Sequence, residues 1–162
     1  MIREYDIAWA KYMENAKIIP LPLTCWDIFY NYNSEIENYN FIQKEWKIKE
    51  NFSKIVNLEK REIVITNANQ EIVFATNGIY DMNGWNSFEM IGKSPKIFQG
   101  KLTSETSRNN IRTAIKNQLP FKEIILNYRK DNSTYLCEIE GYPKFNKNGD
   151  LLNYIAFERI AS

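Results

Sequence analysis

Two patterns of hydrophobic and polar residues divide the chain near residue 60. Before that point, apolar side chains recur at helical spacing, which predicts helices over residues 3–17 and 24–29. Ser34 and Glu37 match a capping box, so a third helix is expected from Ser34 to about Trp46. Residues 1–60 are therefore predicted to form an N-terminal helical extension.

After residue 60 the hydrophobic period becomes two, which is the period of a strand with one buried face. Five strands are predicted, over residues 62–66, 71–75, 121–129, 134–143 and 151–159. Between the second and third strands lie irregular residues with short helical pieces, and then one good helix over 104–118. This order predicts an α+β domain over residues 61–162, in which an antiparallel sheet carries its helices on one face.

Composition excludes several classes of protein. With 21 basic and 20 acidic residues the formal charge is +1, which argues against binding to nucleic acid. No apolar run approaches the length of a membrane span, and the charged N-terminus does not resemble a signal peptide. We therefore expect a cytoplasmic protein with no nucleic-acid or membrane partner.

The absence of histidine narrows the chemistry further. It excludes triad-type hydrolysis, a histidine general base and histidine-ligated haem. Cys25 and Cys137 lie far apart and lack the spacing of a metal or redox motif. We expect neither a metal site nor a haem.

Four stretches carry a resemblance to a known family. The loop Gly-x-x-Pro-Lys-x-Phe-Gln-Gly at residues 92–100 and Asn-Tyr-Arg-Lys-Asp at 127–131 are specific in combination, and residues 65–75 and 148–157 agree with them. Residues 61–160 resemble the PAS superfamily, and within it the light-oxygen-voltage (LOV) branch. The resemblance implies a five-stranded antiparallel sheet that cups a cavity under short helices.

The same loop departs from the LOV pattern at its chemical centre. A LOV domain attaches flavin mononucleotide (FMN) through a cysteine in a Gly-x-Asn-Cys-Arg-Phe-Leu-Gln loop. Here Ser94 takes the asparagine position and Pro95 the cysteine position, so the covalent photocycle is impossible. Lys96 replaces the phosphate-binding arginine, which keeps the charge but loses the bidentate geometry.

Four further positions complete the candidate site that the resemblance implies. Gln99 and Asn127 are retained, whereas Cys137 replaces a flavin-facing asparagine and Glu158 replaces the glutamine that senses the flavin ring. Because several polar contacts are lost, we expect no tightly bound FMN and name no other cofactor. The candidate cavity residues are Lys96, Gln99, Asn127, Cys137 and Glu158.

Two interpretations of this inner face stay open. Asn127, Cys137 and Glu158 are the polar groups of a ligand pocket, or bulky side chains fill the space as a structural core. A carboxyl group inside the cavity should have a raised pKa unless it is paired. The alternative is that Glu158 lies near the mouth of the cavity and pairs with a lysine or arginine.

The opposite face of the sheet is predicted to be apolar, although a solvated face should be polar. Its outward residues include Leu126, Tyr128, Leu136, Ile155 and Phe157. Something must cover such a surface, and either the N-terminal helices or a second copy of the chain fits. We expect the N-terminal segment to cover part of it and a homodimer or another protein partner to use this face.

The predicted function is a stand-alone sensory or protein-interaction PAS module in signal transduction. No output domain is recognised, so we expect it to signal in trans through the outer sheet face and the N-terminal helices, and to bind a small ligand in the cavity. The alternative is a flavin-binding LOV-like module without covalent photochemistry. We do not expect an enzyme, because Glu158 has no second, partnered catalytic group.

Overall fold

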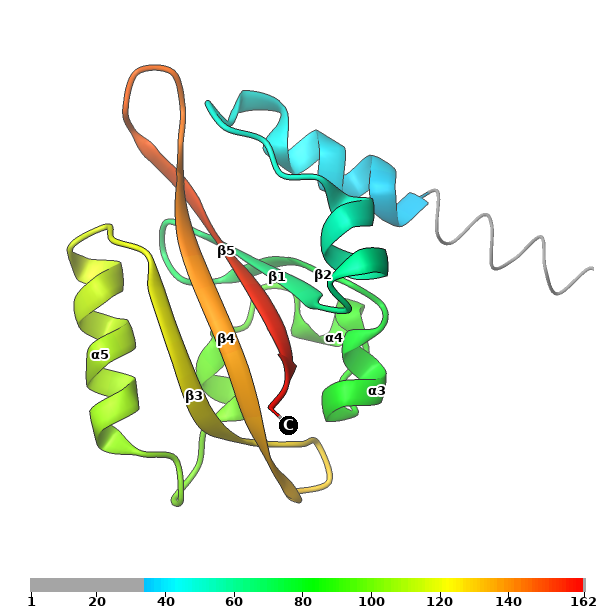
Figure 1. Cartoon of the computed structure of the whole chain (residues 1–162), viewed down its shortest axis with the longest axis vertical. Coiled ribbons are helices and arrows are strands. Elements are labelled where there is room, and N and C mark those ends of the chain that lie inside the picture. The colour runs from blue at the N-terminus through cyan, green and yellow to red at the C-terminus, as the bar shows by residue number, and fades with distance from the viewer. Residues whose placement is uncertain (1–33, 162) are drawn as a thin grey trace, which may run out of the picture. The chain divides into compact units, whose positions relative to one another are not determined.

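A single five-stranded antiparallel sheet organises the part of the chain that the structure, a computed structural model, describes (residues 34–161). The strand order is β2-β1-β5-β4-β3, so the first and last strands of the sheet domain pair at its centre (Figure 1). The strands are β1 (Glu62–Asn67), β2 (Ile72–Ala75), β3 (Phe121–Tyr128), β4 (Thr134–Phe145) and β5 (Leu151–Ile160). All five predicted strands are confirmed.

Local turn chemistry sets the strand ends. The side-chain oxygen of Asn67 accepts hydrogen bonds from the backbone N–H groups of Asn69 and Glu71, which closes the β1–β2 turn. Asn132 between β3 and β4 has a φ of 69°, and Gly149 between β4 and β5 has a φ of 91°. Asparagine and glycine tolerate this left-handed conformation, which is why the chain reverses there.

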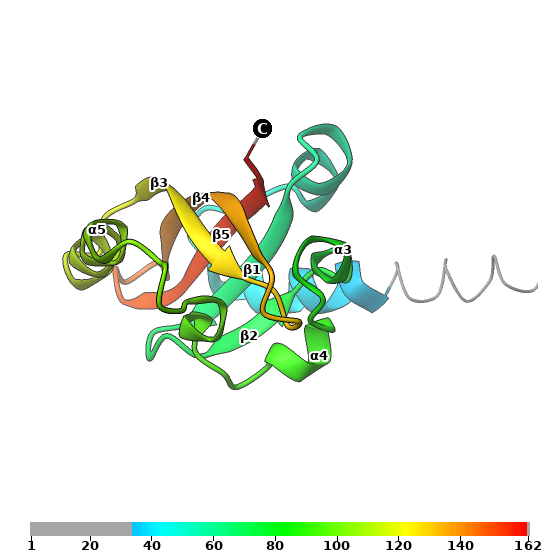
Figure 2. The same cartoon turned by 90° about the horizontal axis from the view of Figure 1, so that it is seen from below.

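The inner face of the sheet carries the helices that follow β2. They are α3 (Ile79–Asn83), α4 (Ser87–Met90), the 3₁₀ helix η3 (Pro95–Phe98) and α5 (Glu105–Lys116). Figure 2 shows α5 beside β3 at one end of the sheet and α3 and α4 beside β1 and β2 at the other. The predicted helix over 104–118 is confirmed, with Ser104 as its N-cap.

The main hydrophobic core lies between this face and the helices. Its buried members come from four strands and three helices, and they include Val64, Ile72, Ile79, Met82, Met90, Phe98, Ile125, Tyr135 and Cys137. Cross-strand pairs such as Ile125 with Cys137 place these side chains on one face, as period-two alternation requires. The fold predicted from the sequence, with helices on one face of the sheet, is confirmed.

Residues 35–58 cover the outer face along β2, β1 and β5. Tyr39, on the helical stretch 34–42, is fully buried and packs against Phe52 and Phe74. Trp46 follows the short helix η1 (Gln43–Glu45), and its Nε1 donates to Oδ1 of Asn153 at 2.8 Å. The π-helical turn η2 (Lys54–Leu58) contacts β1. The boundary at residue 60 stays a prediction.

Several expectations concern residues outside the described range. The helices predicted over 3–17 and 24–29, together with Cys25, lie there. None of the helices among residues 34–161 combines the length and the hydrophobicity that a membrane span requires.

The outer face divides into a covered and an uncovered part. Ile155 and Phe157 are buried, so they are not open to a partner as the sequence suggested. Near the edge of the sheet, Ile124 and Leu136 remain 57% and 51% exposed. The apolar surface left for a partner is therefore smaller than predicted, and it lies on β3 and β4.

Candidate functional site

A cavity of about 710 Å³ lies between the inner face of the sheet, η3 and α5. This volume falls in the range of about 300–1,000 Å³ that is typical of small-molecule sites. Its apolar wall includes Val64, Phe98, Ile111, Ile115, Phe121, Ile125, Ile139 and Ala156. Gly141 opens the wall beside Phe121, because a Cβ at this glycine would lie 2.3 Å from the phenylalanine ring. The inner face thus contains both a packed core and a cavity, and the binding of a ligand there stays a prediction.

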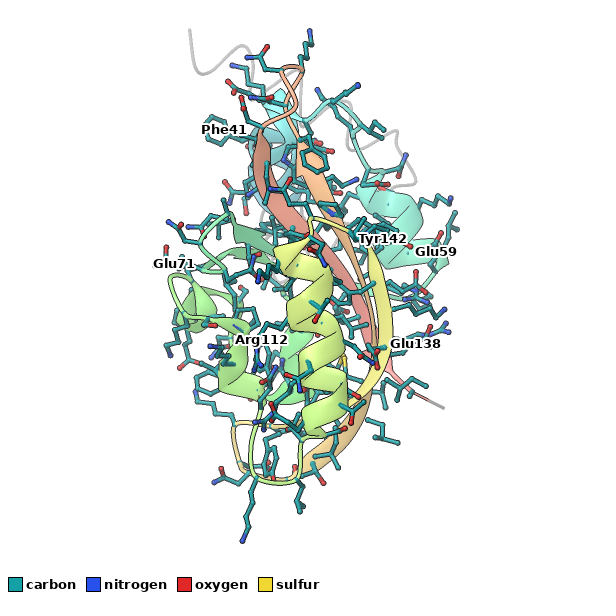
Figure 3. The ribbon with its side chains drawn as sticks, turned by 90° about the vertical axis from the view of Figure 1, so that its left-hand side faces the viewer. Phe41, Glu59, Glu71, Arg112, Glu138 and Tyr142 are labelled. Atoms are coloured by element: carbon teal, nitrogen blue, oxygen red, sulfur yellow. The ribbon has the colours of Figure 1, made fainter. Side chains whose placement is uncertain are left out.

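Basic side chains gather where the cavity opens to solvent. Arg108 and Arg112 project from one face of α5 at an i, i+4 spacing, and Lys96 comes from η3. Lys96 and Arg112 are exposed, whereas Arg108 is half-buried and donates to the carbonyl of Gly100. The labels in Figure 3 place Arg112 and Glu71 on this side of the sheet. Glu105 pairs with Arg108 at 3.5 Å and with Arg112 at 3.9 Å, and Glu71 also lines the cavity. The three cations still outnumber these two carboxylates, so the mouth is suited to an anionic group.

Glu158 lies on the wall of the cavity, deep in the protein. Its side chain is 4% exposed, and Sγ of Cys137 donates to its Oε2 at 3.6 Å. None of the ion pairs among the described residues includes it, so it does not pair at the mouth as the alternative supposed. Burial raises the pKa of Glu158 to about 7, and the charge of Glu62 adds to the effect. At neutral pH this group both donates and accepts protons readily.

Cys137 lies behind Glu158 and does not line the cavity. Its side chain is fully buried between Ile125 and Glu158, and burial raises the pKa of the thiol well above its usual value. A protonated thiol without solvent access is chemically inert. The remaining three predicted site residues, Lys96, Gln99 and Asn127, all line the cavity, and Asn127 is buried.

Sequence reasoning missed several polar residues of the wall. Arg108 was detectable, because it lies three positions before the inward-facing Ile111, and Arg112 follows four positions after Arg108 on the same helix. Thr66 and Gln70 at the β1–β2 hairpin gave no such signal. Thr66 Oγ1 and Gln70 Nε2 are buried and have no hydrogen-bond partner among the described residues. Buried polar atoms of this kind are rare, and a bound molecule or water often supplies the missing partner.

Comparison with known proteins identifies the family. Residues 61–159 match the PAS domain family. This chain belongs to that family. Protein TWIN LOV 1 of Arabidopsis thaliana is 36% identical over 88 residues, which are 54% of this chain and 22% of that protein. The blue-light photoreceptor of Listeria innocua serovar 6a is 27% identical over 109 residues, 65% of this chain and 43% of that protein.

Solved structures agree with the fold of this PAS domain. The dark structure of the blue-light photoreceptor Aureochrome1 LOV superposes with a TM-score of 0.64 at 24% identity, covering 72% of this chain and 86% of that one. A LOV domain studied with a flavin analogue gives a TM-score of 0.63 at 23% identity, covering 67% and 83% of the two chains. The chain is a LOV-like PAS domain, a sensory module of signal transduction.

The residues present fit only part of an FMN site. The basic mouth suits a phosphate, and Gln99 and Asn127 offer amide groups to a ring. Other positions do not match the groups of a LOV flavin site. Pro95 has no thiol, and Cys137 contacts Glu158 and does not line the cavity. At Glu158 a carboxyl group stands where the resemblance implies an amide. Covalent flavin chemistry therefore has no residue to support it at this loop.

Proposed function

We propose that this PAS domain is a non-enzymatic sensor whose cavity binds a small organic anion with an apolar or aromatic body. The single observation that supports this most is the polarity of the cavity. Basic side chains stand at the mouth, apolar side chains form the walls, and an unpaired carboxyl group lies in the buried wall. A purely structural core would not leave about 710 Å³ unfilled between such groups.

Native mass spectrometry of the purified protein tests this proposal. We expect a fraction of the chain to carry additional mass, which is released on denaturation and identifies the ligand. The double variant R112Q/K96Q should lose most of it, because both cations are exposed and their removal does not disturb the fold. The variant K116Q, at the end of the same helix but away from the cavity lining, is the matched control. A bare chain from several expression hosts would contradict the proposal.

Non-covalent flavin binding is the second candidate, and Gln99, Asn127 and the basic mouth favour it. Its test is a titration with FMN and riboflavin, followed by quenching of flavin fluorescence. If the basic side chains at the mouth of the cavity bind the phosphate group, FMN should bind at least about tenfold more tightly than riboflavin, which lacks this group. A protein that stays colourless after incubation with either flavin would remove this candidate.

We also propose that a partner or second copy docks on the uncovered part of the outer face, defined here as the β3–β4 patch (Ile124, Leu126 and Leu136). Ile124 and Leu136 are more than half exposed there. Exposed aliphatic neighbours on an edge of a sheet favour association. Concentration-dependent sedimentation of the wild-type protein measures whether the partner is a second copy.

A further inference from the structure

Three glutamates, Glu158, Glu62 and Glu35, follow one another in space from the wall of the cavity to the helical stretch 34–42. Glu158 on β5 and Glu62 on β1 are direct cross-strand partners, so both side chains lie on the inner face. Side chains of directly opposed antiparallel residues have Cβ atoms only about 5 Å apart, and like charges there repel each other. The charge of Glu62 contributes to the raised pKa of Glu158, so the ionisation of one group affects the other, and Glu158 lines the cavity.

Glu62 is held against the loop that leads into α3. The hydroxyl of Thr76 donates to Oε2 of Glu62. A Cβ on Gly78 would lie 2.3 Å from Oε1 of Glu62, so the absence of a side chain at this glycine lets the carboxyl group approach the backbone. The hydrogen bonding and the surroundings of the Glu62 carboxyl group therefore depend on the position of residues 76–78.

Glu35 binds the same loop from the N-terminal side. Its Oε1 accepts a hydrogen bond from the backbone N–H of Asn77, which follows Thr76 directly. Glu35 lies on the helical stretch 34–42, whose Tyr39 is buried against the outer face. The Asn77 bond thus ties this helix to the loop that Glu62 contacts.

No cation compensates these charges within the described range. None of the ion pairs there includes Glu158, Glu62 or Glu35. The other titratable groups that face them are Cys137 and Tyr135 at Glu158 and Asp81 at Glu62, and each of these is neutral or negative. Burial raises the pKa of Glu62 and of Glu35, and the charge of Glu62 contributes at Glu35.

We infer that Glu158, Glu62 and Glu35 form a carboxyl relay, which carries the ionisation state of the cavity wall to the N-terminal helix. An ionised Glu158 disfavours charge on Glu62, and a neutral Glu62 in turn favours charge on Glu35. An ionised Glu35 is the stronger acceptor for the Asn77 N–H, so it holds the helix more firmly. Protonation of Glu158 reverses each step and loosens the helix.

The relay regulates the ligand site and in that sense rests on the proposed function. A ligand that accepts a hydrogen bond from Glu158 keeps this group protonated and loosens residues 35–46. A ligand that donates a hydrogen bond to the carboxylate has the opposite effect. The relay itself needs no ligand, so it is tested on the ligand-free full chain, separately from cavity binding.

The first test measures the titration of side-chain carboxyl carbons by NMR in protein labelled with ¹³C-glutamate. In E62Q the pKa of Glu35 should fall, because a like charge has been removed. In E158Q the pKa of Glu35 should rise, because Glu62 now ionises more easily. This opposite sign is the signature of a relay, since a loss of structure would move both variants in the same direction.

The second test measures hydrogen exchange over residues 35–46 near neutral pH. Protection should fall about fivefold in E158Q, the lower end of the range typical of coupled sites, while protection in β4 and β5 does not fall. E123Q is the matched control, because Glu123 lies on the same face of the sheet but binds Asn110. An unchanged pKa of Glu35 in both relay variants, or equal loss of protection across the sheet, would overturn the inference.

Discussion

Glu138 on β4 and Glu158 on β5 face opposite sides of the same sheet, and their surroundings differ in each respect that controls a carboxyl group. Glu138 binds Arg159 through two hydrogen bonds and Arg61 through one, and these lower the pKa of Glu138 to about 2. Glu158 has a thiol neighbour and no cation, and burial raises its pKa to about 7. Figure 3 shows Glu138 with Tyr142 on the far side of the sheet from Arg112.

The difference separates carboxylates that are paired with cations from a carboxyl group that has no cation partner. On the outer face, Glu138 and Glu140 share Arg61, Arg159 and Lys122, so the charge cluster is locked into one protonation state. On the inner face, burial raises the pKa of Glu158 to about 7, and this group borders a cavity. A carboxyl group whose protonation state changes near neutral pH is suited to a sensor, whereas a carboxylate that stays ionised in ion pairs only links strands.

Replacing Glu158 by glutamine should have the largest effect on stability. The folded-state pKa lies above the ordinary value of 4.5, so the folded protein binds the proton more tightly than the unfolded chain. The free energy of unfolding of the wild type therefore falls as pH rises from about 4.5 to about 7. E158Q lacks this fall and should be more stable at pH 8 by up to roughly 3 kcal/mol.

Urea denaturation of both proteins across this pH range measures the effect. Below the ordinary pKa of a glutamate the two curves should converge, since both side chains are then neutral. Parallel curves at all pH values would show that Glu158 is not the titrating group.

Replacing Arg61 by methionine should cost about 2 kcal/mol, because it leaves two partly buried carboxylates short of one cation. Arg61 is buried and bonds to both Glu138 and Glu140. The matched control is K122M, which removes a second cation from the same carboxylates but one that is 65% exposed. Because the ammonium group that it removes is screened by solvent, that variant should cost clearly less than R61M. Equal losses in chemical denaturation would contradict the distinction between buried and exposed partners.

Trp46→Phe tests how the N-terminal segment is fastened to the outer face. The substitution removes the hydrogen bond to Asn153 while it keeps an aromatic ring, and should cost about 1 kcal/mol. Hydrogen exchange of residues 35–58 should rise more than that of the sheet. F41L changes an aromatic ring on the same segment that is 76% exposed, and it should leave both quantities unchanged. A matching loss in F41L would contradict this attachment.

Leu136→Asp should have the smallest effect on folding and the clearest effect on association. Leu136 is exposed, so the free energy of unfolding should change by no more than about 0.5 kcal/mol. If two copies meet on the β3–β4 patch, the variant should sediment as a monomer at concentrations where the wild type associates. L102D alters an exposed leucine outside the patch and should sediment like the wild type. A wild-type protein that is monomeric throughout leaves a heterologous partner as the occupant of the patch.

Most of the fold could be predicted, because alternation and turn residues are local properties. The strands over 62–66 and 71–75 needed only the period-two pattern and Asn67, and the inward direction of Asn127 and Glu158 followed from the same alternation. Cys137 was correctly oriented, yet alternation does not show that Glu158 separates it from the cavity. Whether an inward-facing side chain reaches the cavity depends on the side chains of the neighbouring strand, and alternation along its own strand does not reveal them.

The outer face shows the same limit. Its apolar character was visible in the sequence, but Ile155 is buried and Ile124 exposed, although both point to the same side. Which of them is covered depends on where residues 39–58 cross the sheet, and this is decided by contacts such as Trp46 with Asn153, 107 positions apart.

Local pattern was thus enough for an antiparallel sheet with its helices on one face and for its strand faces, because each depends on neighbours in the chain. The PAS family and the loss of the reactive cysteine at Pro95 followed from the resemblance of the 92–100 loop to LOV domains. The charge state of Glu158, the grouping of Lys96 with Arg112, and the chain of carboxyl groups from Glu158 to Glu35 depended on tertiary structure. Burial and through-space charge set those properties, and both arise from residues that meet only when β1 pairs with β5 and the helices close over the sheet.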